Sequence, residues 1–238
     1  LEARRLKLGR FLPERSTFAK PIKAPSKDIF DFMKVTTGDK EIYTTIALVR
    51  MLTSLMRDKN ISPRLVPIIP DEARTFGMEG FFQKIWIYAH EGQKYEPEDS
   101  AQLSSYKEEK SGQVLEEGIN EAGAMSSWIA AATAYTNHDI EMIPIYTFYS
   151  MFGFQRIGDL AWAAGDSQAR GFLIGATAGR TTLAGEGLQH QDGHSHLIAS
   201  TIPNCVSYDP TFHYELAIIF REGLRRMHEK KENVFYYI

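Results

Sequence analysis

The sequence predicts an α/β fold with a doubly wound, mostly parallel sheet and helices on both faces. Short apolar runs, typical of buried strands, alternate about five times with longer segments of helical periodicity. The chain of 238 residues is long enough for a sizeable core, and its 43% hydrophobic and 24% charged residues are ordinary for a globular protein. Ligands bind such sheets outside the carboxyl ends of the strands, so the residues that follow each strand carry the functional interest.

The first 37 residues are expected to form a connecting arm, and residues 38–238 the globular domain. Three prolines break any long helix in the arm. Its first 30 residues hold eight Lys or Arg against three Asp or Glu. Few of these residues are aromatic and only one pair of basic residues is adjacent, so we interpret the segment as an arm and not as a nucleic-acid patch.

Helices and strands alternate through the rest of the chain. Apolar side chains at helical spacing, a stretch rich in alanine, and an Asp209-Pro210 pair typical of a helix start indicate the helices. Residues 91–110 are polar and are expected to form a surface excursion. The expected helices cover residues 40–59, 113–136, 155–168 and 208–230, and the expected strands cover residues 65–69, 142–148, 171–176, a short run ending at residue 206, and residues 234–238.

The composition argues against several classes of protein. The net charge of −3 gives no indication of nucleic-acid or anionic-membrane binding. No run of about 18 apolar residues occurs, so no membrane span is expected. The single cysteine, Cys205, cannot form an internal disulfide and fits a reducing, cytoplasmic compartment. Its apolar neighbours indicate a buried structural thiol.

Glu121 is the first candidate for chemistry. It lies among Gly, Ala, Ile and Met residues on a predicted helix. Partial burial there would favour its protonated form and suit it to proton exchange with a ligand nitrogen. An ion pair with a nearby Lys or Arg is the alternative interpretation.

A polar loop over residues 185–196 is the second candidate. It carries two carboxylates and three histidines within seven residues. His190, His194 and His196 could bind zinc, but no cysteine lies nearby. We therefore favour a loop that contacts substrate or cofactor, with a solvated loop as the remaining alternative.

Two further stretches follow predicted strands. Residues 146–156 are rich in aromatic rings that could stack on a flat heterocycle, although core packing alone is the simpler explanation. Asp71 and Glu72 follow the strand at residues 65–69 and could bind a ligand or cap the next helix. The sequence contains no P-loop, no Gly-x-Gly-x-x-Gly between strand and helix, and no Gly-x-Ser-x-Gly, so a simple kinase, Rossmann dehydrogenase or α/β-hydrolase has no support.

Four segments together resemble the central region of the homodimeric pyruvate dehydrogenase E1 family, which belongs with the transketolase-like enzymes. They are residues 71–80, 117–121, 149–159 and 185–190. The motifs are long and nearly continuous, and the resemblance extends over almost the whole chain, including the arm.

The resemblance implies a pyrimidine-binding domain of a thiamine diphosphate enzyme. In this family the cofactor lies between two domains, usually of different subunits; one holds the diphosphate and Mg²⁺, and the other holds the aminopyrimidine. Glu121 matches the glutamate that hydrogen-bonds ring nitrogen N1′ and favours the 4′-imino tautomer, which leads to attack on a 2-oxo acid.

The resemblance assigns further site residues and no metal ligand. Phe152 matches the ring that stacks on the aminopyrimidine, and Tyr149 and Arg156 match neighbouring cofactor-site residues. His196 aligns with a substrate-facing histidine of transketolases. Four polar residues match residues that line the active-site channel of the family. Asp71 is expected to contact the cofactor, and Glu72, Glu186 and His190 are expected to act in catalysis.

One departure from the family concerns the diphosphate site. The family's diphosphate domain carries Gly-Asp-Gly, followed about one helix later by Asn. Here Gly-Asp occurs three times and is never followed by Gly. Mg²⁺ is therefore expected from a domain outside this chain, and the chain alone is expected to be inactive.

The leading hypothesis is a central E1 domain for oxidative decarboxylation of pyruvate and acetyl transfer to lipoyl-bearing E2. The expected partners are a second copy of the chain or the diphosphate-binding domain, lipoyl-bearing E2 and a small 2-oxo acid, with neither nucleic acid nor membrane. An apolar contact surface and self-association follow from this hypothesis. The alternatives are a cofactor-free dimerisation or scaffold domain of the same fold, another transketolase-like enzyme, and a metal-dependent hydrolase.

Overall fold

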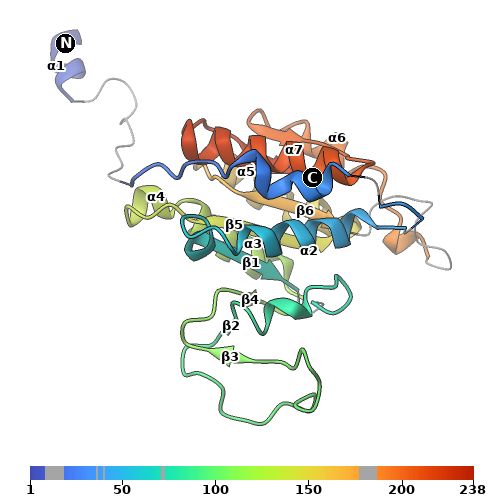
Figure 1. Cartoon of the computed structure of the whole chain (residues 1–238). Coiled ribbons are helices and arrows are strands. Elements are labelled where there is room, and N and C mark those ends of the chain that lie inside the picture. The colour runs from blue at the N-terminus through green and yellow to red at the C-terminus, as the bar shows by residue number, and fades with distance from the viewer. Residues whose placement is uncertain (9–18, 36, 40, 71–72, 177–186) are drawn as a thin grey trace.

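The computed structural model describes residues 1–8, 19–35, 37–39, 41–70, 73–176 and 187–238 (Figure 1). Within these residues, six strands form one sheet in the order β4-β1-β5-β6-β8-β7, and every neighbouring pair is parallel. The strands are β1 (Leu65–Ile69), β4 (Leu115–Glu116), β5 (Ile143–Tyr149), β6 (Phe172–Ala176), β7 (Cys205–Ser207) and β8 (Phe235–Tyr237). The predicted parallel α/β sheet is confirmed.

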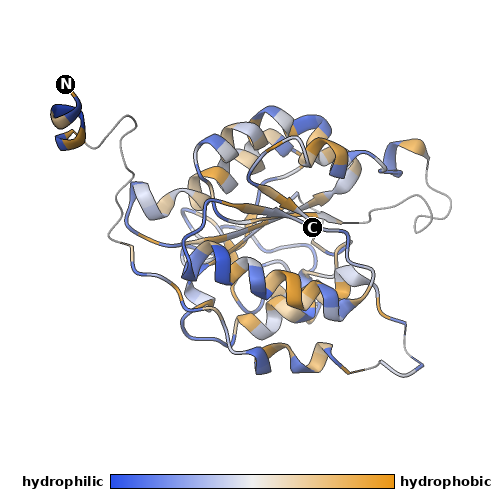
Figure 2. Cartoon of the chain, turned by 90° about the horizontal axis from the view of Figure 1, so that it is seen from above, coloured by the Kyte–Doolittle hydropathy of each residue, from blue (hydrophilic) through white to orange (hydrophobic). Residues whose placement is uncertain are grey.

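Helices cover both faces of this sheet (Figure 2). Among the described residues, two helices cover one face and three cover the other, so the sheet has a hydrophobic core on each side. The side chains of β5 alternate between these cores, as the pleat requires: Ile145 lies in the core with two helices and Tyr146 in the core with three. None of the described helices combines the length and hydropathy needed to span a membrane. The first pair is α2 (Thr44–Leu55) and α7 (His213–Leu224), and the other three are α3 (Glu121–Ala132), α5 (Gly153–Asp166) and α6 (Ser195–Ala199).

Shorter elements complete the described part of the chain. Two strands, β2 (Ile87–Tyr88) and β3 (Glu108–Glu109), pair in parallel and form a small lobe beyond β4 (Figure 1). The polar excursion expected over residues 91–110 belongs to this lobe. The other elements are α1 (Glu2–Lys7), α4 (Ala134–Asn137), the 3₁₀ turns Lys27–Met33, Ser62–Arg64, Glu79–Phe81, Ser150–Phe152 and Leu188–His190, and the π-helical turn Arg225–Glu229.

Three predicted helices begin later than expected, and the one predicted over residues 40–59 begins at Thr44 and ends at Leu55. In the helix predicted over residues 113–136, the first residues pair with β1 as strand β4, and the helix begins only at Glu121, where the side chain of Asn120 accepts a hydrogen bond from the N–H of Gly123. The helix predicted over residues 208–230 begins at His213. The carboxylate of Glu215 accepts the N–H groups of Thr211 and Phe212, which precede the helix, so Asp209-Pro210 does not form the cap.

Part of the predicted arm packs on the domain. Ile22, Phe30 and Met33 are buried in the core shared with α2 and α7. The N–H of Ile22 donates to the carbonyl of His228, which anchors the chain beside the π-helical turn. The boundary at residue 37 stays a prediction.

Candidate active site

The carboxyl ends of β4, β1 and β5 lie side by side and form the framework of the site. From β1 the chain continues to β4 on one side, whereas from β5 it continues to β6 on the other side. The connections therefore diverge between β1 and β5, and this switch point is where doubly wound sheets bind ligands. Glu121 begins the helix after β4, Tyr149 ends β5, and Arg156 lies on the helix that follows.

An ion pair connects two of the predicted site residues. Nη1 of Arg156 donates to Oε1 of Glu121 at 2.5 Å. The Glu121 side chain is 11% exposed and that of Arg156 is 47% exposed. The guanidinium carbon also lies 4.4 Å from the centre of the Phe152 ring. One arginine thus contacts both the carboxylate and the ring, and the ion pair considered as an alternative from the sequence is present.

Glycine at position 153 places the turn that carries Phe152. This turn, Ser150–Phe152, follows β5 directly. A Cβ added at Gly153 would lie 2.1 Å from the ring of Phe148. Only glycine allows the backbone to approach that buried ring so closely, so the local sequence fixes the distance between Phe152 and the sheet.

Aromatic rings gather beside the ion pair. The ring centres of Phe152 and His190 are 5.4 Å apart, those of Tyr149 and His190 are 5.6 Å apart, and those of Tyr149 and Phe152 are 6.3 Å apart. The buried ring of Phe76 packs against this group, with its centre 5.2 Å from that of Tyr149. Segments from β5 and from the loop after β6 therefore meet, as expected of residues that follow neighbouring strands.

The histidine-rich loop is fastened to the same edge of the sheet. The carboxylate of Asp192 accepts the N–H groups of His194 and Ser195. Burial alone would raise the pKa of Asp192, but hydrogen bonds from Ser195 and the backbone of His194 outweigh burial and hold it below its ordinary value. The Ser195 hydroxyl donates to the carbonyl of Ser150, which ties the loop to the turn after β5.

The other histidines of the loop have different partners. Nε2 of His194 lies 3.2 Å from Nε2 of Gln155, and the ring of His196 packs 4.9 Å from Tyr237. In the part of the chain that the structure describes, no three His, Cys, Asp or Glu side chains are grouped as metal ligands. Cys205, predicted to be a buried thiol, is only partly buried against the core of α3, α5 and α6, and desolvation raises its pKa to about 12.

Three predicted residues, Asp71, Glu72 and Glu186, lie outside the described residues. Their assignment stays a prediction. Glu121, Tyr149, Phe152, Arg156 and His190 lie close together, although the sequence positions that they occupy span 70 residues.

Sequence reasoning missed a group of polar side chains beneath Glu121. Tyr146 is fully buried, and its hydroxyl has no hydrogen-bond partner among the described residues. Nearby, the Ser127 hydroxyl donates to Glu117 at 2.5 Å. The sequence did contain an indication, because a tyrosine on an otherwise apolar buried strand must find a partner for its hydroxyl.

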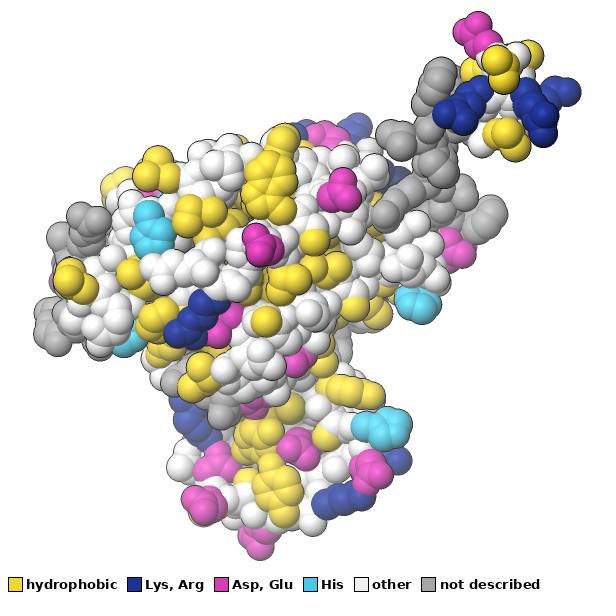
Figure 3. All heavy atoms as spheres, turned by 180° about the vertical axis from the view of Figure 1, so that it is seen from behind, with side chains coloured by type: hydrophobic (Ala, Val, Ile, Leu, Met, Phe, Trp, Pro, Cys, Tyr) yellow, Lys and Arg dark blue, Asp and Glu magenta, His cyan; other side chains and the backbone are white. Residues whose placement is uncertain are grey.

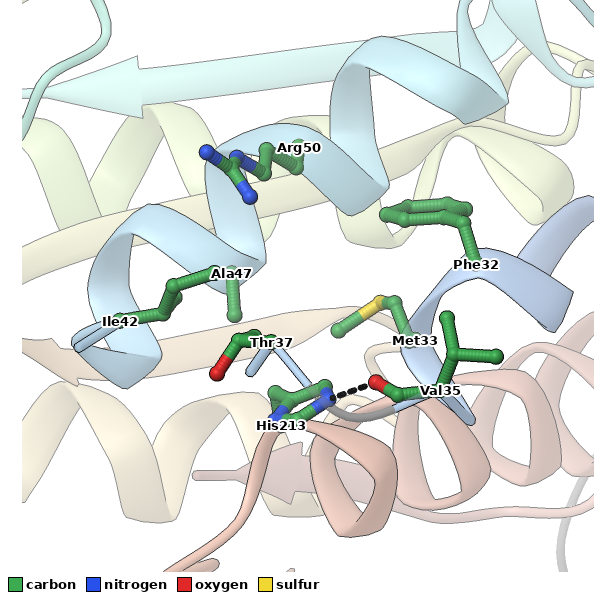
Figure 4. Close-up of a pocket in the computed structure, with 8 residues that line it drawn as sticks. All are labelled: Phe32, Met33, Val35, Thr37, Ile42, Ala47, Arg50 and His213. Atoms are coloured by element: carbon green, nitrogen blue, oxygen red, sulfur yellow. Dashed lines mark hydrogen bonds between the residues drawn. The ribbon is translucent and has the colours of Figure 1, made fainter. Parts of the chain in front are cut away.

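The arrangement suits recognition of a flat nitrogen heterocycle. A shielded carboxylate can exchange one proton with a ring nitrogen, and neighbouring aromatic side chains can contact the ring faces. A separate cavity of about 320 Å³ lies between the 3₁₀ turn Lys27–Met33, α2 and α7, and contains none of these residues (Figure 4). In that cavity, Arg50 is the charged side chain among mainly apolar neighbours.

Comparison with known proteins relates the chain to one family. A family model described as "Pyruvate dehydrogenase E1 component middle domain" matches residues 22–238. The pyruvate dehydrogenase E1 component of Pseudomonas aeruginosa is 62% identical over 238 residues, which cover 100% of this chain and 27% of that protein. That of Escherichia coli K12 is 59% identical over 240 residues, with the same two coverages. The chain therefore spans 27% of the length of these curated relatives.

Solved structures share the fold at lower sequence identity. Transketolase from Campylobacter jejuni superposes with a TM-score of 0.62 at 15% identity, covering 89% of this chain and 27% of that chain. Transketolase from Leishmania mexicana gives a TM-score of 0.61 at 18% identity, covering 86% and 26%. The predicted fold type is thus confirmed.

Proposed function

Because the chain belongs to the pyruvate dehydrogenase E1 component middle domain family, we propose that it is the pyrimidine-binding domain of a longer, thiamine-diphosphate-dependent pyruvate dehydrogenase. The observation that carries the proposal is the grouping of Glu121, Phe152 and His190 at the switch point of the sheet. The 62% identity to an E1 component favours this activity over that of another transketolase-like enzyme.

The described residues fit the pyrimidine end of the cofactor. The Glu121 carboxylate is shielded, and the half-buried rings of Tyr149 and Phe152 stand on the same side of the sheet edge. No Gly-Asp-Gly occurs in the sequence, so the diphosphate and Mg²⁺ would be held by another domain. Bound thiamine diphosphate would supply the nucleophilic carbon and the electron sink for decarboxylation.

Glu121 would hold the proton at the ring nitrogen. Arg156 contacts Oε1 of Glu121, and Oε2 would then be the oxygen that faces the ligand. Arg156 would keep the carboxylate oriented while Phe152 contacts the ring. This division of contacts lets one carboxylate bind its neighbour and the ligand at once.

Residues after β1 and β6 would orient the substrate. His190 lies against the rings of Tyr149 and Phe152 and would contact the 2-oxo acid. Glu72 and Glu186 would act with it in catalysis, and Asp71 would contact the cofactor. These roles rest on the resemblance of the surrounding sequence.

The proposal includes partners and a cytoplasmic location. The cofactor cleft needs a second domain, from another copy of the chain or from a diphosphate-binding domain, and acetyl transfer needs lipoyl-bearing E2. Apolar side chains spread over the face seen in Figure 3. Phe212, which caps α7, and Ile218, in the middle of that helix, are 53% and 62% exposed. Such side chains favour contact with a partner, and self-association stays a prediction.

The test uses the full-length polypeptide and its Glu121→Gln variant. Decarboxylation of 2-oxo acids is measured with Mg²⁺, thiamine diphosphate and an artificial electron acceptor. Glu121→Gln is expected to lower kcat by about 10²- to 10⁴-fold, because proton exchange at the ring nitrogen is lost. The chain alone is expected to show no turnover.

The matched control is Asp166→Asn, an exposed carboxylate at the end of α5. It is expected to retain full activity. Full activity in Glu121→Gln would contradict the assignment of Glu121. Absence of activity in every full-length form would instead favour a cofactor-free scaffold.

A further inference from the structure

Tyr146 carries a buried hydroxyl without a direct partner. Its side chain is 0% exposed, and no hydrogen bond reaches its hydroxyl oxygen within the described residues. A buried hydroxyl that loses its contacts with water costs free energy of folding unless something replaces them. Such groups are few in native proteins, so this one requires an explanation.

Tyr146 lies on the same side of the sheet as the polar groups near Glu121. Its side chain belongs to the core cluster that also contains Met125 and Trp128 of α3 and Ile157 of α5. The side chain of Glu117 is on this side too, because Ser127 of α3 donates to it.

The strand register also places Tyr146 near Glu117. Tyr146 is paired with Ile68 of β1, and the N–H of Glu117 donates to the carbonyl of Ile69, the next residue of that strand. Both side chains therefore lie near the carboxyl edge of the sheet, at the start of α3.

Three charged groups from different parts of the described chain act electrostatically on the Tyr146 hydroxyl. They are Glu121 on α3, Glu117 after β4 and Arg156 on α5. Burial raises the pKa of Tyr146, the two carboxylates raise it further, and Arg156 acts in the opposite direction. The phenol therefore stays protonated at neutral pH and can only gain by donating its hydrogen to an acceptor.

We propose that Tyr146 is a positioning residue for Glu121, acting through one buried water that accepts from the Tyr146 hydroxyl and donates to the carboxylates of Glu117 and Glu121. No direct hydrogen bond joins these groups in the described chain, and a polar contact beyond hydrogen-bond distance is the place for a bridging water. One acceptor contact and two donor contacts give the water the three bonds that buried waters typically make.

The bridging water explains how Glu121 keeps a fixed orientation. Arg156 holds Oε1 from the exposed side, and the water holds the carboxylate from the buried side. The inference rests on the proposed function, because the value of this orientation lies in presenting Glu121 to a ring nitrogen. It adds Tyr146 and Glu117 to the residues that support that reaction.

Tyr146→Phe in the full-length enzyme tests the inference. This variant removes one oxygen and leaves the ring packing intact. We expect kcat to fall about 3- to 10-fold, the range that one net hydrogen bond would give, with an unchanged KM for the 2-oxo acid.

A second readout does not depend on turnover. The affinity for thiamine diphosphate, measured by calorimetric titration in the presence of Mg²⁺, is expected to weaken by a similar factor. Tyr135→Phe is the matched control, since its hydroxyl donates to the carbonyl of Gln168, away from Glu121. It is expected to leave kcat and the affinity for thiamine diphosphate unchanged.

The outcomes separate this inference from the proposed function. If Glu121→Gln is impaired while Tyr146→Phe matches the wild type in kcat and in affinity for thiamine diphosphate, the bridging water is refuted and the proposed function stands. A rise in thermal stability of Tyr146→Phe with unchanged activity would also refute it, because the hydroxyl would then be an unsatisfied group. If Glu121→Gln keeps full activity, the proposed function itself fails.

Discussion

Arg156 connects the two side chains that the proposed function needs most. Its guanidinium pairs with Glu121 and lies against the ring of Phe152. A planar guanidinium can do both, because its edge binds a carboxylate while its face lies on an aromatic ring. A lysine ammonium offers a point charge and cannot serve both contacts in the same way.

Arg156→Gln is expected to weaken thiamine diphosphate binding about 3- to 10-fold, since a half-exposed ion pair and a cation–π contact are each modest. The affinity of Arg156→Lys for thiamine diphosphate is expected to lie between those of Arg156→Gln and the wild type, because lysine keeps the charge and lacks the planar guanidinium. Calorimetric titration of the full-length protein with Mg²⁺ present measures the difference. Tighter binding by Arg156→Gln would mean that Arg156 competes with the ligand for Glu121.

Helix α5 depends on close backbone contact at its first residue. Gly153 begins the helix against the ring of Phe148, and that ring stacks on Tyr237 at an interplanar angle of 4°. Because Phe148 is buried and held by a second ring, it has little room to move. The start of α5 therefore fixes where Phe152 and Arg156 lie relative to the sheet.

Gly153→Ala is expected to destabilise the protein by about 1–3 kcal/mol, because the added methyl group overpacks the core at Phe148. Gly158→Ala, in the same helix, is the matched control. No atom lies within 4 Å of a Cβ added there, so it is expected to stabilise by about 0.5–1 kcal/mol through helix propensity. Urea unfolding of both variants measures the free energies, and equal effects would contradict the overpacking argument.

The strands of three residues or more in the main sheet could be predicted from the sequence, including β7 and β8, whereas the two-residue strands could not. Apolar runs at residues 65–69, 142–148 and 171–176 correspond to β1, β5 and β6. Strand β4 has two residues and stands before a small-residue helix, so its periodicity is too short to detect. The start of α7 was predicted too early because Asp209-Pro210 has the sequence of a typical helix start. In the structure the carboxylate of Glu215 accepts the N–H groups at the start of the helix instead.

For the candidate site, the segments that resemble the family located Glu121, Tyr149, Phe152, Arg156 and His190. Tyr146 was missed because an apolar strand pattern places a side chain in the core without showing which polar groups stand near it.

At the amino edge of the sheet, far from the candidate site, a buried ion network holds the molecule together. Glu141 accepts from Nη1 of Arg170 at 3.2 Å and contacts Nδ1 of His228 at 2.9 Å. The three side chains are 2%, 8% and 1% exposed. Arg170 also lies 3.9 Å from the centre of the Tyr135 ring. The network joins the segments before β5, β6 and β8, so it ties distant parts of the chain.

Glu141→Leu is expected to destabilise the protein by about 3–5 kcal/mol, because Arg170 would be left buried without a counter-charge. The measurement is the free energy of unfolding in urea. Glu222→Gln breaks a half-exposed pair with Arg225 and is the control, with little change expected. A small effect of Glu141→Leu would show that water reaches Arg170 and replaces the carboxylate.

The position of β8 has a consequence for the order in which the protein can fold during synthesis. Strand β8 lies between β6 and β7, and β7 pairs with no other described strand. Four neighbouring strands, β4, β1, β5 and β6, can assemble while the ribosome is still adding residues. Strand β7 must wait, unpaired, until residues 235–237 have been made. If translation stalls within α7, the edge of β6 is therefore exposed and β7 has no strand to pair with. Unpaired strand edges of this kind favour aggregation of the nascent chain.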